Sequence, residues 1–169
     1  MGEMRVVGIR VEPPQSQPVL LLREVDGERY LPIWIGQSEA ASIALQQKGI
    51  EPPRPLTHDL IVNLIAEFGQ TLREVRIVDM QEGTFYAEMV FGDDLRVSAR
   101  PSDSIAVAMR AGVPIIADES VLTDAGLLIP EEEGEEPGTS SPTKEDEVEK
   151  FKEFLDNVSP DDFKASGGA

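Results

Sequence analysis

The stretch Val97–Arg110 constrains the fold most, because it runs from an alternating strand through Arg-Pro into a helix that is almost entirely apolar. Within Ile105–Ala111 only Arg110 is polar, so this helix has to be covered on most of its sides. Pro101 has a backbone angle that suits the first helical turn, and Gly112 is a typical stop signal. We therefore expect this helix to lie at the centre of the fold.

The N-terminus of the same helix is polar, with Arg100, Ser102, Asp103 and Ser104 close together. We expect the hydroxyl of Ser102 to cap the free N–H groups there. A helix start also attracts anions through its dipole and its unpaired N–H groups. Two interpretations stay open at this point, namely a cap with a local Arg–Asp pair, or a ligand-binding or catalytic site.

Length and composition narrow the class of protein. A chain of 169 residues is long enough for one domain with a substantial core and an appendage. It contains no cysteine, which excludes disulfides, thiolate catalysis and cysteine-based zinc sites. No apolar run approaches the length of a membrane span, and residues 1–10 have no secretory h-region. We expect a soluble cytoplasmic protein that does not bind membranes.

The net charge is −17, and residues 126–169 contribute 13 acidic and 4 basic residues to it. A strongly acidic protein repels nucleic acid at long range. Binding to DNA or RNA would therefore need a local basic cleft or bridging cations.

Hydrophobic periodicity predicts an α/β (α+β) domain in which a mostly antiparallel mixed sheet supports about three packed helices. The helix that starts at Thr57 has the clearest one-face apolar pattern, and Leu95, Val97 and Ala99 are expected on one covered face of their strand. The expected strands are residues 5–11, 19–22, 30–35, 72–80, 85–91, 95–99 and 115–117. The expected helices are residues 38–48, 57–68 and 101–111, with one or two further helical turns in 118–124.

The composition changes after residue 125, so we expect three regions. Residues 1–125 form the folded domain, and residues 126–142 form an acidic disordered linker. Residues 143–169 combine a short amphipathic helix with a frayed end. The apolar face of that helix needs a partner surface, either on its own domain or on a partner protein.

Two short blocks echo each other. Arg54–Asp59 reads Arg-Pro-Leu-Thr-His-Asp and Arg100–Asp103 reads Arg-Pro-Ser-Asp, and each marks a helix start. If the sheet brings the two starts together, two dipoles and two guanidinium groups converge on one anion. Phosphodiester chemistry needs such cationic stabilisation. The candidates for substrate binding are Arg54, Thr57, Arg100 and Ser102.

His58 is the only histidine, and its ordinary pKa suits proton transfer near neutral pH. The alternative is an exposed histidine, or one that bonds a neighbouring carbonyl. Glu39 lies in the first turn of its helix, where the dipole favours a carboxylate with or without a chemical role. The catalytic candidates are Glu39, His58 and Asp103. The candidates for binding a divalent metal such as Mg²⁺ are Glu39, Asp59 and Asp103.

Several blocks in the same order resemble the bifunctional nuclease domain family, which is named for DNase and RNase activity. They are Leu31–Gly36 with Glu39-Ala40, Pro53–Leu60, Phe85–Ala87, Ala99–Ala106 and Val113–Ile115. The resemblance covers about residues 5–125 and implies a nuclease with an α/β fold that forms a homo-oligomer. Members of the family commonly carry aspartate two residues before the arginine of the Arg-Pro-Ser-Asp block, where this chain has Ser98.

The sequence thus favours an enzyme that hydrolyses phosphodiester bonds of DNA and RNA, with metal assistance. The alternative is a non-catalytic regulatory or scaffold module that binds a small anion or a partner protein. The acidity of the chain and the absence of a standard catalytic signature favour this alternative.

Overall fold

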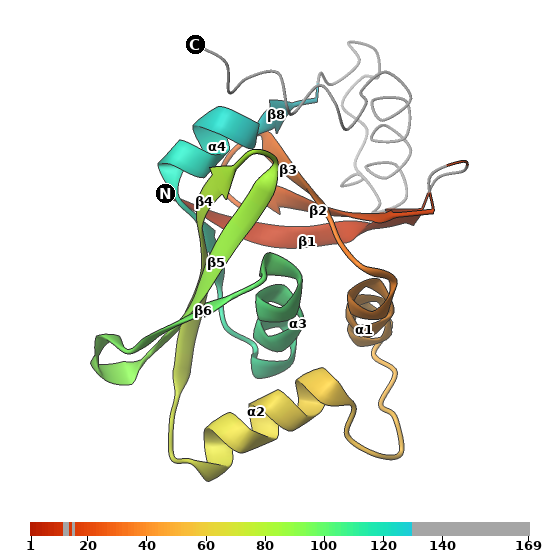
Figure 1. Cartoon of the computed structure of the whole chain (residues 1–169), viewed down its shortest axis with the longest axis vertical. Coiled ribbons are helices and arrows are strands. Elements are labelled where there is room, and N and C mark those ends of the chain that lie inside the picture. The colour runs from red at the N-terminus through yellow and green to blue at the C-terminus, as the bar shows by residue number, and fades with distance from the viewer. Residues whose placement is uncertain (12–13, 15, 130–169) are drawn as a thin grey trace, which may run out of the picture.

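The computed structural model describes residues 1–11, 14 and 16–129. Within them the chain forms an α+β fold, in which one eight-stranded sheet has the order β6-β5-β4-β7-β1-β2-β3-β8. Helices α1, α2 and α3 lie on one side of the sheet, and α4 lies near the edge that carries β8 (Figure 1). The predicted fold class is confirmed. The expected linker from residue 130 onward and the expected helix in residues 143–169 lie outside the described residues.

The sheet is antiparallel except where β4 and β7 run parallel. Pro32 in β3 lies beyond the two residues of that strand that β8 pairs with, so its missing N–H faces an unpaired edge. The strands are β1 Gly2–Val11, β2 Pro18–Glu24, β3 Arg29–Trp34, β4 Leu72–Gln81, β5 Thr84–Phe91, β6 Arg96–Ala99, β7 Ile115–Ala117 and β8 Leu127–Leu128. Strand β8 extends the sheet past residue 125, where we expected the linker to begin.

Four helices complete the domain within the described residues: α1 Gln37–Gln47, α2 Thr57–Glu67, α3 Pro101–Ala111 and α4 Glu119–Ala125. Helix α3 packs between α1 and α2 and against β4 and β5. Its residues Ile105, Ala106, Val107 and Ala108 are all buried, as the apolar run predicts. Gly112 ends it with a positive φ of 67°, a conformation that glycine adopts without strain.

The main core lies between the sheet and helices α1, α3 and α4. Its largest fully buried side chains include Leu20, Leu31, Ile43, Ile77, Ile105 and Leu122. A smaller cluster of Val7, Val19, Leu21 and Tyr30 covers part of the other face of the sheet. No helix within the described residues is long and apolar enough to span a membrane.

Two expectations about covered apolar faces are wrong. In β6 and the turn before it, Leu95 and Val97 are about half exposed and only Ala99 packs against the core, because β6 is the outermost strand. In α2 only part of the apolar pattern is covered, since Ile61 and Ile65 pack against the core while Leu60 remains half exposed.

Candidate functional site

Arg100 is the residue from which α3 begins. It is the N-cap and has an extended backbone conformation, so the expected cap by the Ser102 hydroxyl is wrong. Ser102 lies inside the first turn and is buried, whereas the hydroxyl of Ser104 donates a hydrogen bond to the carbonyl of Arg100. Pro101 holds the first helical position, as predicted, and the Arg100 side chain before it is 66% exposed.

Two carboxylates hold the Arg100 guanidinium. Its Nε donates to Oδ2 of Asp103 at 2.7 Å, and its Nη2 donates to Oε1 of Glu39 at 2.9 Å. Asp103 belongs to α3 and Glu39 to α1, so the guanidinium bridges two helices. Since a guanidinium has five N–H groups, several donors remain for an anion from solvent.

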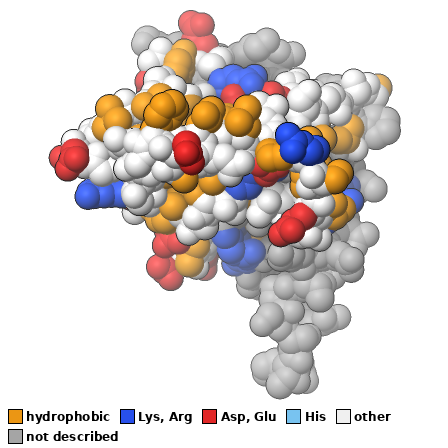
Figure 2. All heavy atoms as spheres, turned by 90° about the horizontal axis from the view of Figure 1, so that it is seen from below, with side chains coloured by type: hydrophobic (Ala, Val, Ile, Leu, Met, Phe, Trp, Pro, Cys, Tyr) orange, Lys and Arg blue, Asp and Glu red, His pale blue; other side chains and the backbone are white. Residues whose placement is uncertain are grey.

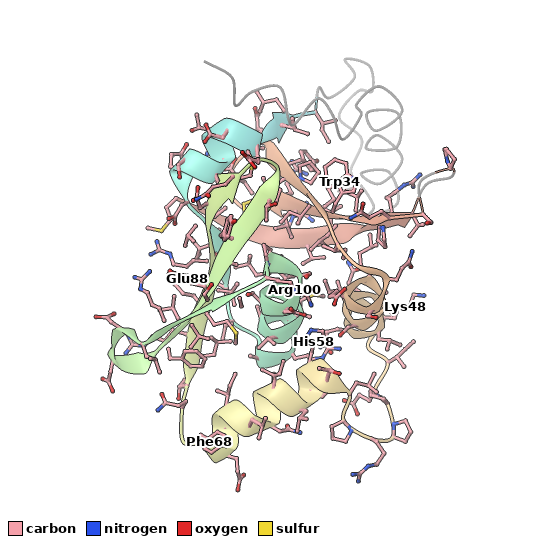
Figure 3. The ribbon with its side chains drawn as sticks, in the orientation of Figure 1. Trp34, Lys48, His58, Phe68, Glu88 and Arg100 are labelled. Carbon is pink, nitrogen blue, oxygen red and sulfur yellow. The ribbon has the colours of Figure 1, made fainter. Side chains whose placement is uncertain are left out.

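The second oxygen of Asp103 connects α3 to α2. Oδ1 of Asp103 lies 2.9 Å from Nε2 of His58, and Nδ1 of His58 lies 2.7 Å from the hydroxyl of Ser42 in α1. The His58 side chain is only 8% exposed. The two helix starts with an Arg-Pro sequence in front of them therefore do meet, on the side of the molecule where α1, α2 and α3 come together (Figure 3).

The hydrogen bonds have one consistent direction. Nη2 of Arg110 donates to the Ser42 hydroxyl at 3.0 Å, which leaves that hydroxyl free to donate to Nδ1 of His58. Nε2 of His58 then carries the proton and donates to Asp103. Both ring nitrogens of His58 are therefore occupied.

Arg110 is the buried member of this hydrogen-bonded group and contacts all three helices. Its Nε donates to Oδ1 of Asp59 at 2.7 Å, and its other nitrogens donate to the carbonyls of Ala106 and Ser42. Oδ2 of Asp59 accepts the backbone N–H of Leu56 at 2.9 Å, which stabilises the start of α2. Asp59 thus has a structural partner on each oxygen.

The ion pairs keep the acidic groups charged. Burial raises the pKa of Asp103, but hydrogen bonds from Arg100 and His58 outweigh it, so the pKa lies below its ordinary value. The backbone N–H of Leu56, with help from Arg110, lowers the pKa of Asp59. Asp103 and Glu39 raise the pKa of Arg100. The site therefore combines an exposed cation with ionised carboxylates.

Gly36 explains how Glu39 reaches Arg100. It is the N-cap of α1, between β3 and the helix, and the Glu39 carboxylate folds back over it into the space that a Cβ would occupy. Glycine is therefore needed for this close approach rather than for an unusual backbone angle, since its φ is −78°.

The carboxylates do not form a metal-binding group as they stand. Among the described residues, no three or more His, Asp or Glu side chains are arranged to hold a metal ion. Glu39 and Asp103 accept from Arg100, and Asp59 accepts from Arg110, so a cation would have to displace a guanidinium. The donor set does not fit a resident Mg²⁺, and the metal requirement stays a prediction.

The remaining sequence candidates lie outside the bonded group. Arg54 and Thr57 are exposed at the start of α2, and Arg54 makes no ion pair with any residue that the structure describes. Ser98 is exposed on β6, opposite Glu88 in β5. An open hollow of about 510 Å³ lies beside the group and is lined by Gln46, Asp59, Asn63 and Arg110, but not by Arg100 or Asp103.

Sequence reasoning missed Ser42 and Arg110. Arg110 did leave a signal, because a lone polar residue in a buried apolar helix needs buried partners. Ser42 left none, because one serine among alanines is also typical of a closely packed helix surface.

Comparison with known proteins finds a matching family and several similar proteins. The model of the bifunctional nuclease domain matches residues 20–130, a range that contains all the site residues described above. An uncharacterized protein of Mycobacterium tuberculosis (strain CDC 1551 / Oshkosh) is 71% identical over 166 residues, which cover 98% of this chain and 100% of that protein.

Two rice proteins are more distant. Bifunctional nuclease 1 of Oryza sativa subsp. indica is 24% identical over 131 residues, covering 74% of this chain and 39% of the rice protein. Bifunctional nuclease 2 of Oryza sativa subsp. japonica is 27% identical over 127 residues, covering 71% of this chain and 39% of its own length. The match thus spans well under half of each plant protein.

Proposed function

This chain belongs to the bifunctional nuclease domain family, and from that premise we propose that it hydrolyses phosphodiester bonds of DNA and RNA. The observation that carries the proposal is the group Glu39–Arg100–Asp103–His58, in which an exposed guanidinium lies between two carboxylates and in front of a buried histidine.

Arg100 is the proposed phosphate-binding residue. It is two-thirds exposed and its position is fixed by Asp103 and Glu39, so little side-chain freedom is lost when a phosphate binds. The start of α3 adds the partial positive charge of its dipole. A local cation of this kind is what an acidic protein needs in order to hold a nucleic acid backbone.

Asp103 is the proposed general base. Its side chain is partly exposed and ionised, and it lies beside the guanidinium that would hold the phosphate. A water molecule attacks phosphorus and gives its proton to Asp103, while the bond to the leaving oxygen breaks and that oxygen takes a proton from solvent. The charge of the transition state is stabilised by Arg100.

His58 is buried, and both of its ring nitrogens are occupied, so we assign it a positioning role. Its Nε2–H fixes the orientation of Asp103, and Ser42 fixes the ring. Glu39 acts in a similar way on Arg100. In this proposal Arg100 and Asp103 contact the substrate, and His58 and Glu39 act through them.

A second function is favoured by one observation, namely that every carboxylate in the group already has a cationic partner. A module that binds a phosphate or another small anion through Arg100 without cleaving it would have the same arrangement of side chains.

The chain lacks cysteine, which is typical of proteins in a reducing compartment. We propose that the protein works in the cytoplasm.

Binding and cleavage separate the two functions. Highly purified protein is incubated with a fluorescently labelled single-stranded DNA or RNA oligonucleotide, and both anisotropy and product length are measured. Cleavage that co-purifies with the protein and is lost in Asp103→Asn while binding remains supports the nuclease. Binding without cleavage in both proteins supports the anion-binding module.

A further inference from the structure

The second face of the sheet carries an apolar cluster over β1, β2 and β3. Its buried members, with exposures of 2%, 5%, 1% and 9%, are Val7, Val19, Leu21 and Tyr30. Trp34 and Ile129 pack against them. No helix within the described residues contributes a side chain to this cluster, since α1, α3 and α4 bury theirs in the main core. A sheet face without a layer over it is exposed to water, so the cluster needs a cover that these helices do not supply.

Arginines border the cluster on the same face. Residues directly opposite each other in an antiparallel pair point to the same side of the sheet. Arg23 lies opposite Tyr30, with its guanidinium carbon 5.2 Å from the ring centroid, and Arg5 lies opposite Arg23. Arg10 lies opposite Val19 at the other end of the cluster. In a protein of net charge −17, this face is therefore apolar in the middle and basic at both ends.

We propose that this face binds residues 143–158 of the same chain as an amphipathic helix, the tail helix. Its apolar residues, which recur at helical spacing, are Val148, Phe151, Phe154, Leu155 and Val158. The same segment contains six acidic and three basic residues. The apolar stripe fits the cluster, and the acidic residues complement the arginines. Arg5 and Arg23 in particular gain from a nearby carboxylate, because like charges directly opposite each other destabilise a sheet.

The dimensions of the two surfaces agree. A helix about 10 Å wide covers three strands that are spaced about 4.8 Å apart. The apolar stripe from Val148 to Val158 is about 15 Å long at a rise of 1.5 Å per residue. The cluster from Tyr30 to Trp34 is about 14 Å long at a rise of 3.4 Å per residue. The connection formed by residues 130–142 spans up to roughly 46 Å, which exceeds the diameter of a small domain.

The place where the described chain ends favours this occupant over a separate protein. Ile129, the last of the described residues, itself packs against the cluster, so the chain leaves the domain beside this face. A segment tethered next to its binding surface has an effective concentration on the order of millimolar, which a separate partner would have to exceed. Residues 143–158 also follow the matched family domain, which ends at residue 130.

Helix α2 presents another apolar surface, but burial distinguishes it from the sheet cluster. Figure 2 shows apolar side chains in a row across the face of the molecule that α2 forms. Leu60 and Leu64 in that helix and Phe68 at its end are 50%, 44% and 77% exposed. The surface of α2 is thus open to water, whereas no buried member of the sheet cluster exceeds 9%. We therefore place the tail helix on the sheet.

The first test is the fluorescence of Trp34, the only tryptophan, which reports on this face alone. In the full chain, Phe154→Glu should shift its emission to longer wavelength and increase its quenching by acrylamide, because water then reaches the indole. The matched control is Phe163→Glu, which makes the same substitution in the same tail but outside residues 143–158. This control should leave both emission and quenching unchanged.

The second test is amide hydrogen exchange of the full chain, measured by mass spectrometry. Residues 143–158 should exchange on the order of tenfold more slowly in the wild type than in Phe154→Glu or Arg23→Glu. Arg23→Glu acts through charge, because it leaves the apolar side chains of the cluster in place. Peptides from α3 should exchange equally in all three proteins, which shows that the domain stays folded.

The docking does not depend on the proposed hydrolysis, because Arg100, His58 and Asp103 lie on the helical side of the sheet, and exchange is measured without substrate. Equal exchange of residues 143–158 in wild type and Phe154→Glu would overturn the proposal. Trp34 emission that does not respond to Phe154→Glu would also overturn it and assign the face to a partner protein. Protection that disappears on dilution would contradict binding within one chain.

Discussion

Nε2 of His58 lies 2.9 Å from Oδ1 of Asp103, although 45 residues separate them in the sequence. This contact joins the first turns of α2 and α3. The Asp103 carboxylate therefore contacts Arg100 through one oxygen and His58 through the other. The consequences of removing each member can be measured separately.

His58→Ala should destabilise the protein as well as inactivate it. The change leaves a cavity and removes the partner of the Ser42 hydroxyl and of Asp103, so we expect the free energy of unfolding to fall by about 2–4 kcal/mol. Urea denaturation followed by circular dichroism measures this. Lys48→Ala, at the exposed end of α1, is the control and should change the free energy by less than about 0.5 kcal/mol.

His58→Gln tests the positioning role more specifically. An amide N–H can still donate to Asp103, so we expect partial recovery of kcat relative to His58→Ala with little change in KM. If His58 were itself the base, the glutamine variant would be as inactive as the alanine variant.

Gly36→Ala should impair the site without unfolding the domain. The backbone of Gly36 is in a region open to alanine, but the new Cβ occupies the space of the Glu39 carboxylate. We expect the melting temperature to stay close to wild type, while kcat/KM falls roughly tenfold, about 1.4 kcal/mol. A variant that keeps full activity would show that the contact of Glu39 with Arg100 is not needed.

Acid should weaken the Asp59–Arg110 pair. Because the folded protein lowers the pKa of Asp59 below its ordinary value of 3.8, this group stabilises the fold above that value and loses the effect as pH falls through the folded pKa. Asp59→Asn should cost roughly 1–2 kcal/mol at pH 7 and less at pH 3. Thermal unfolding of both proteins from pH 7 to pH 3 measures the difference, and parallel curves would contradict it.

Magnesium should bind the free protein weakly. Since Arg100 and Arg110 already occupy the carboxylates, calorimetric titration with MgCl₂ should show no saturable site up to about millimolar concentration, whereas a dedicated carboxylate site binds more tightly. A saturable isotherm that Asp103→Asn removes would instead establish the metal site predicted from the sequence.

The sequence was a good guide wherever one residue has a local physical effect. Pro101 and Gly112 correctly predict the two ends of α3, and the apolar run correctly predicts that the helix is buried. The shared Arg-Pro pattern raises the condition that the starts of α2 and α3 meet. His58 and Asp103 do bring them together, but the two guanidinium groups do not converge, because Arg54 lies outside the bonded group.

The predictions that failed depend on which residue begins the helix or on neighbours that are distant in sequence. Ser102 could cap the helix in principle, but Arg100 takes the N-cap position and Ser102 is buried inside the first turn. The partners of Arg110 come from α1 and α2, which no periodicity in α3 specifies. Leu60, Leu64 and Phe68 fit the apolar pattern of α2 but are exposed, because a helix with two apolar faces gives nearly the same pattern as one with a single wide face.

The central claim is that Arg100 and Asp103 together cleave phosphodiester bonds, and single-turnover cleavage of a labelled oligonucleotide tests it most directly. Arg100→Gln and Asp103→Asn should each lower the rate about 10²–10³-fold. The matched control is Arg96→Gln, which breaks the exposed pair of Arg96 with Glu88 on the edge of the sheet and should leave the rate unchanged. Equal rates in all four proteins would contradict the claim.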